Sequence, residues 1–181
     1  MKTIVDDKFL SKKDLHFIEN GVLNSSFPFY WNGNQCYHKD GSPDETGFLS
    51  HTVVKRVELR SKDEPFFNSK LGEHFVDILN SFCNKNKVKY KKILRIAVNL
   101  TFNVGRTKSL IHNDHDFPYK QLLVYLTDNK NAPTVLLSKD KKKVVKEVRP
   151  KKYRGFMFNN YPHYMHMPKE GKRIIIVYTF V

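Results

Sequence analysis

Residues 91–103, KKILRIAVNLTFN, carry an apolar side chain at every second position from Leu94 to Phe102. Successive side chains of an extended strand point to opposite faces, so this alternation predicts a half-buried β-strand. The residues before it follow a helical period, and we therefore expect the β-rich half of the chain to begin here. The positions between the apolar ones are occupied by Arg95, Ala97, Asn99 and Thr101.

Further segments of strand character follow toward the C-terminus, separated by Asn, Pro, Gly and Lys-rich turns. A half built from six or more short strands typically closes as a sandwich or jelly roll, in which alternate residues face the mouth. We therefore expect an α+β, mainly β fold, a cupin-like double-stranded β-helix. The segments are residues 121–127, 134–138, 142–148, 154–160 and 172–181.

Two amphipathic helices are predicted before residue 90, and we expect them to pack on the major sheet. Residues 11–21 have a capping pattern at Ser11 and Asp14 and a stop signal at Gly21. Residues 68–85 carry one apolar stripe. Its members are Leu71, Phe75, Ile78, Leu79 and Phe82.

The remaining N-terminal residues are a turn-rich loop, 25–47, and a segment of strand character, 51–59. No repeat or long linker interrupts the chain. We expect one domain over residues 1–181, with a helical part at about 1–90 and a jelly-roll core at about 91–181.

Composition points to a globular protein of the reducing cytoplasm. Of the 181 residues 40% are hydrophobic, which argues against disorder. No apolar run reaches the roughly 20 residues of a membrane helix, and no secretory signal is recognisable. Cys36 and Cys83 lie 47 positions apart, which favours free thiols over a disulfide framework.

The net charge of +14 is unevenly distributed. Residues Lys139–Arg154 contain nine Lys or Arg against Asp140 and Glu147, a surplus of seven, which is half of the total. Such a run indicates a nucleic acid or another acidic partner, or simply a solvated hairpin.

His112 and Asp114 are separated by one residue in the segment LIHNDHDF, residues 110–117. On an extended backbone residues i and i+2 share a face, so both side chains can bind one metal ion. One further histidine would complete a 2-His-1-carboxylate site, the arrangement of non-haem Fe(II) oxygenases. His115 would point away, toward the surroundings of the site or the surface. By itself the pattern also fits a His/Asp pair that stabilises a turn.

The order of motifs resembles the Fe(II)/2-oxoglutarate-dependent oxygenases, and most of all their small prolyl-hydroxylase-like members of bacteria and phages. The resemblance covers roughly residues 90–181: the HxD of His112 and Asp114, then LLVYLTD, TVLL, GFMFNNYPH and GKRIIIVYTF. It implies Fe(II) as the metal, 2-oxoglutarate as cosubstrate, dioxygen as oxidant and ascorbate as a stimulant. Its phage members also imply the host cytoplasm as the location if a phage encodes the chain.

The resemblance also implies roles for residues near the C-terminus. His163 lies ten positions before Arg173, the spacing of the distal metal ligand, whereas His166 lies seven before it and is the less suitable candidate. Arg173 would bind the distal carboxylate of 2-oxoglutarate, because a guanidinium fork matches a carboxylate. Tyr125 would reach the same carboxylate through its hydroxyl. Thr179 and Asn99 could line the same mouth.

The implied activity is hydroxylation of a substrate C–H bond, with a protein side chain such as proline as the leading substrate. A nucleic acid or a small molecule is the alternative within the same class. Two other classes also fit the fold: a non-catalytic, basic jelly-roll module that binds nucleic acid or associates with a virion, and a zinc-dependent cupin-like enzyme. We expect no membrane partner.

Overall fold

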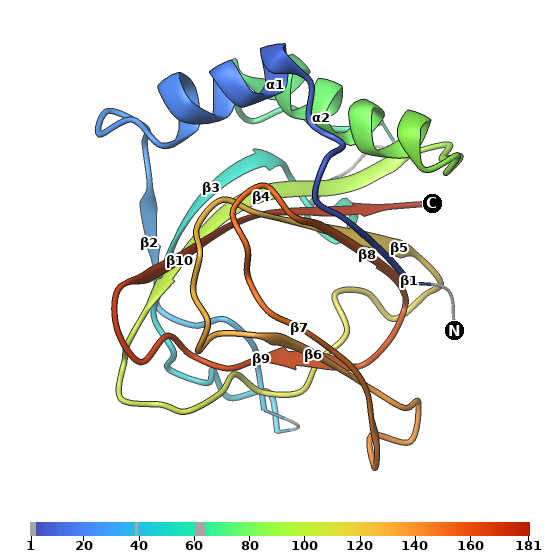
Figure 1. The fold of residues 1–181 in the computed structure, drawn as a ribbon. Helices are drawn as coiled ribbons and strands as arrows, with labels where there is room; N and C mark the ends of the chain where they lie inside the picture. Colours follow the sequence, from blue (N-terminus) through green and yellow to red (C-terminus); the bar gives the residue numbers. More distant parts are fainter. Residues whose placement is uncertain (1–2, 39, 61–63) are drawn as a thin grey trace.

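The computed structural model describes residues 3–38, 40–60 and 64–181, which form two antiparallel β-sheets facing each other (Figure 1). The major sheet has the order β1 (Thr3–Asp6), β8 (Gly155–Asn159), β5 (Lys120–Tyr125), β10 (Lys172–Phe180), β4 (Ile93–Phe102), β3 (Phe48–Val54) and β2 (Tyr30–Asn32). The minor sheet has the order β7 (Val144–Val148), β6 (Thr134–Leu137) and β9 (His163–Met165). The mainly β, jelly-roll fold class is confirmed.

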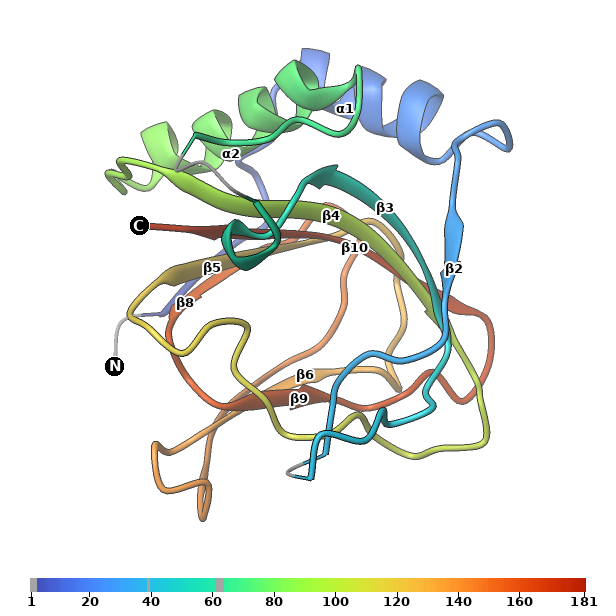
Figure 2. The same ribbon diagram turned by 180° about the vertical axis from the view of Figure 1, so that it is seen from behind.

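Helices cover the face of the major sheet that points away from the minor sheet (Figures 1 and 2). They are α1 (Lys12–Phe17), its continuation as a π-helix over Ile18–Val22, and α2 (Gly72–Lys85), while Val57–Leu59 form a short 3₁₀ turn. The apolar stripe predicted for α2 is buried at Phe75, Ile78, Leu79 and Phe82. Burial of each of these side chains contributes about 1.5–3 kcal/mol to the stability of the fold.

The start of α1 follows the predicted capping box. The Ser11 hydroxyl accepts from the backbone N–H of Asp14, and the Asp14 carboxylate accepts from the backbone N–H of Ser11. The predicted stop at Gly21 is wrong, because the chain continues through it as a π-helix to Val22. Tertiary burial of Ile18 and Val22 against the core overrides the local preference of glycine.

The strand that we expected over residues 91–103 has two covered faces. Ile96 and Val98 point toward the helices and belong to the main core. Arg95, Asn99 and Thr101 line a cavity between the sheets. The polar half of the alternation therefore faces an internal site and not the solvent.

The described residues before position 91 contribute three strands to the major sheet, of which only β3 overlaps an expected segment. β3 ends at Val54, so the strand expected over 51–59 begins earlier and stops sooner. β1 and β2 were not expected, because strands of three or four residues at a sheet edge carry no readable alternation. Neither was β9, which is also only three residues long.

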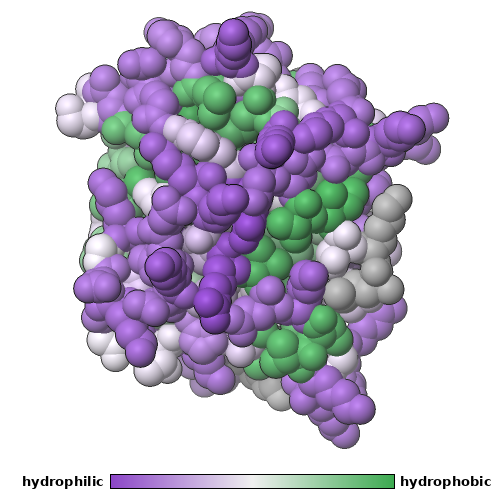
Figure 3. All heavy atoms as spheres, viewed as in Figure 1, coloured by the Kyte–Doolittle hydropathy of each residue, from purple (hydrophilic) through white to green (hydrophobic). Residues whose placement is uncertain are grey.

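The basic run Lys139–Arg154 divides into two parts with different surroundings. Near its C-terminal end, Lys151 and Arg154 pair with Asp7, and Lys152 pairs with Glu19. These residues tie β8 to the N-terminal segment. The lysines of the β6–β7 hairpin form no ion pair with any described residue, and the hydrophilic tip of this hairpin projects from the body (Figure 3). The hairpin lysines without an ion pair are Lys139, Lys141, Lys142, Lys143 and Lys146.

Two further expectations concern the whole chain. Cys36 and Cys83 are free, as predicted, and both are buried. Within the described ranges, no helix has the length and apolar character needed to span a membrane.

Candidate active site

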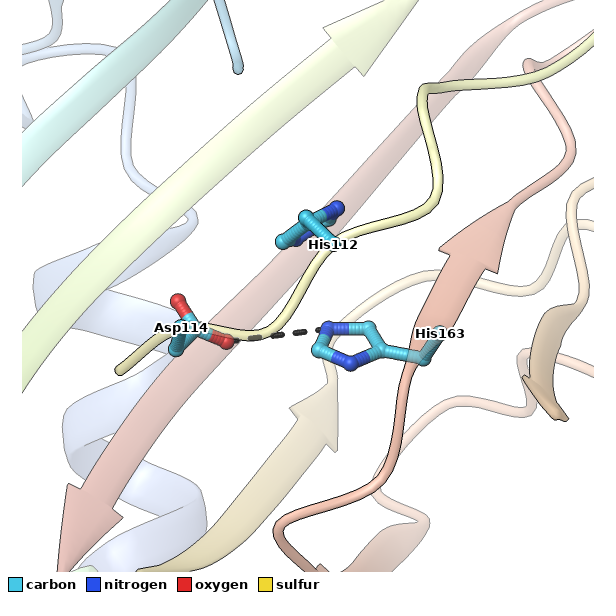
Figure 4. A group of neighbouring side chains, drawn as sticks. All are labelled: His112, Asp114 and His163. Carbon is cyan, nitrogen blue, oxygen red and sulfur yellow. Dashed lines mark ion pairs between the residues drawn. The ribbon is translucent and has the colours of Figure 1, made fainter. Parts of the chain in front are cut away.

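His112, Asp114 and His163 converge between the two sheets and form what we term the His–Asp–His cluster (Figure 4). His112 and Asp114 come from the loop between β4 and β5, and His163 begins β9. Two backbone hydrogen bonds of 2.9 and 3.0 Å join His112 to His163, so the loop is held against the strand. One potential ligand atom from each of the three side chains lies within 4.8 Å of the others.

Both imidazole rings are oriented by backbone carbonyl groups. The Nδ1 atom of His112 lies 3.0 Å from the carbonyl oxygen of Leu110, and Nδ1 of His163 lies 3.0 Å from that of Tyr161. A carbonyl can only accept, so each Nδ1 carries a proton, and Nε2 is the nitrogen left to bind a metal. Burial lowers the pKa of His163 to about 4. The ring is therefore neutral at pH 7, as a metal ligand must be.

The carboxylate of Asp114 is held by two arginines. Its Oδ1 atom accepts from Nη2 of Arg56 at 2.8 Å and from Nη1 of Arg95 at 3.1 Å. Arg56 also donates to the backbone carbonyl of Asp114. Burial opposes ionisation of Asp114, but the two guanidinium groups outweigh it and hold its pKa below the ordinary value. The other oxygen, Oδ2, lies 3.6 Å from Nε2 of His163 (Figure 4).

Arg173 lies on β10 with only 2% of its surface exposed. Its Nη2 donates to the hydroxyl of Thr134 at 2.8 Å and its Nη1 contacts the sulfur of Met165 at 3.1 Å. No carboxylate among the described residues pairs with this guanidinium, and its buried Nε–H has no hydrogen-bond partner. A buried charge without a counter-charge is costly, so this site requires an anion from outside the chain.

Tyr125 lies behind Arg173. Its ring centroid is 5.4 Å from the guanidinium carbon, and its hydroxyl donates to Thr134 at 2.8 Å. The oxygen of Thr134 thus accepts from both Tyr125 and Arg173, which leaves its own O–H free to donate. Because Thr134 lines the cavity, that O–H can be directed toward a ligand of Arg173.

One cavity of about 100 Å³ connects the His–Asp–His cluster to Arg173. Its walls come from the inner faces of both sheets and from the loop that precedes β3. The polar residues of its lining, besides those already described, include Gln35, Asn99, Thr101, Ser109 and Gln121.

The other candidates from the sequence lie outside the cluster. His115 is buried, so the surface position considered for it is wrong; its Nε2 lies 2.8 Å from the hydroxyl of Thr179. Thr179 therefore contacts His115, and neither residue lines the cavity. Asn99 does line it, and its amide oxygen accepts from Ser50 at 2.9 Å. His166 is not part of the cluster.

Arg56 and Thr134 are the contacts that sequence reasoning missed. Arg56 lies 58 positions from Asp114, and Thr134 lies 39 positions from Arg173. No local pattern marks either residue, because their positions follow from the pairing of distant strands.

Solved structures of known proteins share this fold at low sequence identity. An oxidoreductase of the 2OG-Fe(II) oxygenase family from Burkholderia pseudomallei superimposes with a TM-score of 0.72 at 13% identity, over 98% of this chain and 84% of its own. A prolyl hydroxylase from Trichoplax adhaerens, bound to a peptide of the hypoxia inducible factor oxygen degradation domain, gives 0.59 at 15%, over 98% and 82%. A prolyl-4-hydroxylase from Pseudomonas putida gives 0.58 at 12%, over 98% and 91%.

Sequence comparison adds nothing to this: no protein-family model and no curated protein matches the chain. The similarity is one of backbone structure, and in each superposition it extends over nearly the whole chain. The chain therefore has the fold of the 2-oxoglutarate–Fe(II) oxygenases.

Proposed function

We propose that the protein is a dioxygenase dependent on Fe(II) and 2-oxoglutarate, with His112, Asp114 and His163 as the metal ligands. The donor set is two neutral imidazole nitrogens and one carboxylate oxygen, which suits non-haem Fe(II) and leaves coordination positions open. Arg56 and Arg95 hold the second oxygen of Asp114, so the carboxylate is oriented before the metal arrives.

The observation that carries this proposal is the unpaired guanidinium of Arg173. A buried cation in the same cavity as the His–Asp–His cluster fits the distal carboxylate of 2-oxoglutarate. The free Nε–H of Arg173 and the O–H of Thr134 would both donate to that carboxylate. Tyr125 would support Thr134 from behind and would not touch the cosubstrate, which differs from the direct contact that we expected.

Iron and 2-oxoglutarate together supply the oxidation of a C–H bond by dioxygen, with release of succinate and carbon dioxide. The chain's own residues would bind and orient both groups and exclude water from them. A protein side chain such as proline is our leading substrate, and the peptide bound to the Trichoplax enzyme supports this choice.

The test compares Asp114→Ala with Asp116→Ala, an exposed carboxylate two positions later. Fe(II) binding and conversion of 2-oxoglutarate to succinate are measured for both. We expect Asp114→Ala to lose both properties and Asp116→Ala to keep both. Equal metal binding by the two variants would contradict the ligand assignment, and a wild-type protein that binds iron but never forms succinate would contradict the activity.

A further inference from the structure

The charges that line the cavity are unbalanced. Three guanidinium groups, those of Arg56, Arg95 and Arg173, face it, while Asp114 is the one acid among its described lining residues. Three positive charges and one negative charge leave an excess of two. The thiol of Cys36 also lines the cavity, and burial raises its pKa to about 12, so this thiol is neutral at pH 7.

Loading the proposed cofactors leaves this excess in place. Fe(II) brings two positive charges and 2-oxoglutarate two negative ones. One carboxylate of 2-oxoglutarate balances Arg173, and the other, together with Asp114, balances the metal. Arg56 and Arg95 then share Asp114 with the metal, and no other carboxylate of the described residues forms an ion pair with either of them.

Arg95 is the more deeply buried of the two arginines. Its side chain is 14% exposed, against 31% for Arg56, so water screens Arg56 much better. Arg95 makes one hydrogen bond to a described residue, from Nη1 to Asp114. Its Nη2 and Nε have no such partner, and Arg95 lines the cavity. A largely buried guanidinium that shares its one counter-charge with Arg56 and the metal is costly, so an anion is expected beside it.

Two amide side chains in the lining of the cavity each have one atom without a partner. The side-chain oxygen of Gln121 and the side-chain nitrogen of Gln35 are buried and form no hydrogen bond with any residue that the structure describes. Arg95 is paired with Thr179, and Thr179 with Gln121, so Arg95 and Gln121 lie in one row across β4, β10 and β5. Buried amides without partners indicate a ligand that has both donors and acceptors.

We propose that the substrate is an acid, and that Arg95, supported by Arg56, binds its carboxylate beside the metal. Gln121 and Gln35 would bond neighbouring polar groups of the same substrate. This inference rests on the proposed oxygenase activity and names an acid as its substrate, in place of an uncharged side chain such as proline. A carboxylate fits better than a phosphate dianion, because Arg95 is much less exposed than Arg56 and one planar monoanion matches its fork.

Binding of acetate tests the proposal directly. The protein is labelled with ¹⁵N-arginine and loaded with Zn(II), a diamagnetic substitute for Fe(II), and with saturating 2-oxoglutarate. The Nε–H resonances are followed by NMR during titration with acetate, with acetamide as its neutral counterpart. Arg95→Lys identifies the Arg95 signal. We expect acetate to shift the signals of Arg95 and Arg56 to saturation, acetamide to leave them, and exposed Arg149 to stay unchanged with either.

A second variant separates the arginine from the metal as the acetate site. Arg95→Gln keeps the contact of Arg56 with Asp114, and its Zn(II) content is measured first. Followed through the Arg56 signal, its acetate affinity should be at least tenfold weaker than in the wild type. An equal affinity would mean that acetate binds only the metal, and this would overturn the proposal.

Four other outcomes also decide the matter. No shift of Arg95 in protein that holds Zn(II) and 2-oxoglutarate overturns this inference but not the proposed function. A shift seen only without 2-oxoglutarate would mean that Arg95 binds the cosubstrate and not the substrate, which overturns this inference. Tighter binding of dimethyl phosphate than of acetate points to a nucleic acid substrate. A protein that binds neither Zn(II) nor 2-oxoglutarate overturns both proposals together.

Discussion

Replacing Arg173 by methionine separates cosubstrate binding from metal binding. Methionine fills much of the same volume without charge, so the change removes the guanidinium and spares the packing around Tyr125. Arg173 contacts Thr134 and Met165 but none of the three residues of the His–Asp–His cluster. We therefore expect the variant to bind Fe(II) as the wild type does.

The expected loss of 2-oxoglutarate affinity follows from the contacts of the guanidinium. One charge-assisted hydrogen bond contributes about 1.5–3 kcal/mol. Leaving the ligand's carboxylate unpaired in a buried site raises the cost toward about 3–5 kcal/mol. With about 1.4 kcal/mol for each factor of ten, the concentration of 2-oxoglutarate at half-saturation should rise at least tenfold and as much as roughly a thousandfold.

The ligand-free variant offers an independent measurement. Because Arg173 is buried without a counter-charge, its removal should not lower the free energy of unfolding in urea, and we expect a small increase. Arg173→Lys, which keeps the charge but not the fork, should recover part of the 2-oxoglutarate affinity. Wild-type affinity in Arg173→Met would refute the assignment, as would loss of iron in step with loss of 2-oxoglutarate.

Three further predictions use other parts of the structure. His163→Ala should lose the metal and His166→Ala should keep it, which metal analysis after dialysis decides. Tyr125→Phe removes one hydrogen bond of about 0.5–1.5 kcal/mol, so the concentration of 2-oxoglutarate at half-saturation should rise roughly two- to tenfold while the bound metal stays the same. An unchanged concentration would mean that Tyr125 does not support cosubstrate binding. Asp7→Asn should lower the free energy of unfolding by about 1–2 kcal/mol at pH 7. Its bond to Arg154 lowers the pKa of Asp7 below 3.8, so this difference should shrink as the pH falls below 3.8, and a constant difference would contradict the ion pair.

Local patterns predicted the parts of the fold that local physics determines. The alternation of β4, the stripe of α2 and the capping box at Ser11 are each readable within a few residues, because strand pleat, helical period and cap geometry are short-range. The pair His112 and Asp114 was readable for the same reason. The pair lies in a loop with one isolated bridge, and not on the regular strand that we assumed.

Contacts between distant segments could not be predicted in this way. Arg56 follows a strand whose own end was misjudged, and its contact with Asp114 depends on how β3 pairs with β4. Thr134 begins β6 in the other sheet, so its contact with Arg173 depends on the two sheets facing each other. Neither residue type is unusual in its sequence context. Only the pairing of strands brings these side chains to the cavity.

The alternation of side chains along β9 explains why His163, and not His166, lies in the His–Asp–His cluster. It explains this better than the spacing to Arg173 does. Residues i and i+2 of a strand share a face, so His163 and Met165 point to the same side. Met165 contacts Arg173 at 3.1 Å, and His163 lies 3.6 Å from Asp114, which puts this side toward the cavity. His166 is three positions from His163, its backbone pairs with Lys108, and its ring lies against Tyr164. One short strand therefore orients a potential metal ligand and a contact of Arg173 together, so a shift of β9 by one residue would disrupt both ends of the cavity at once.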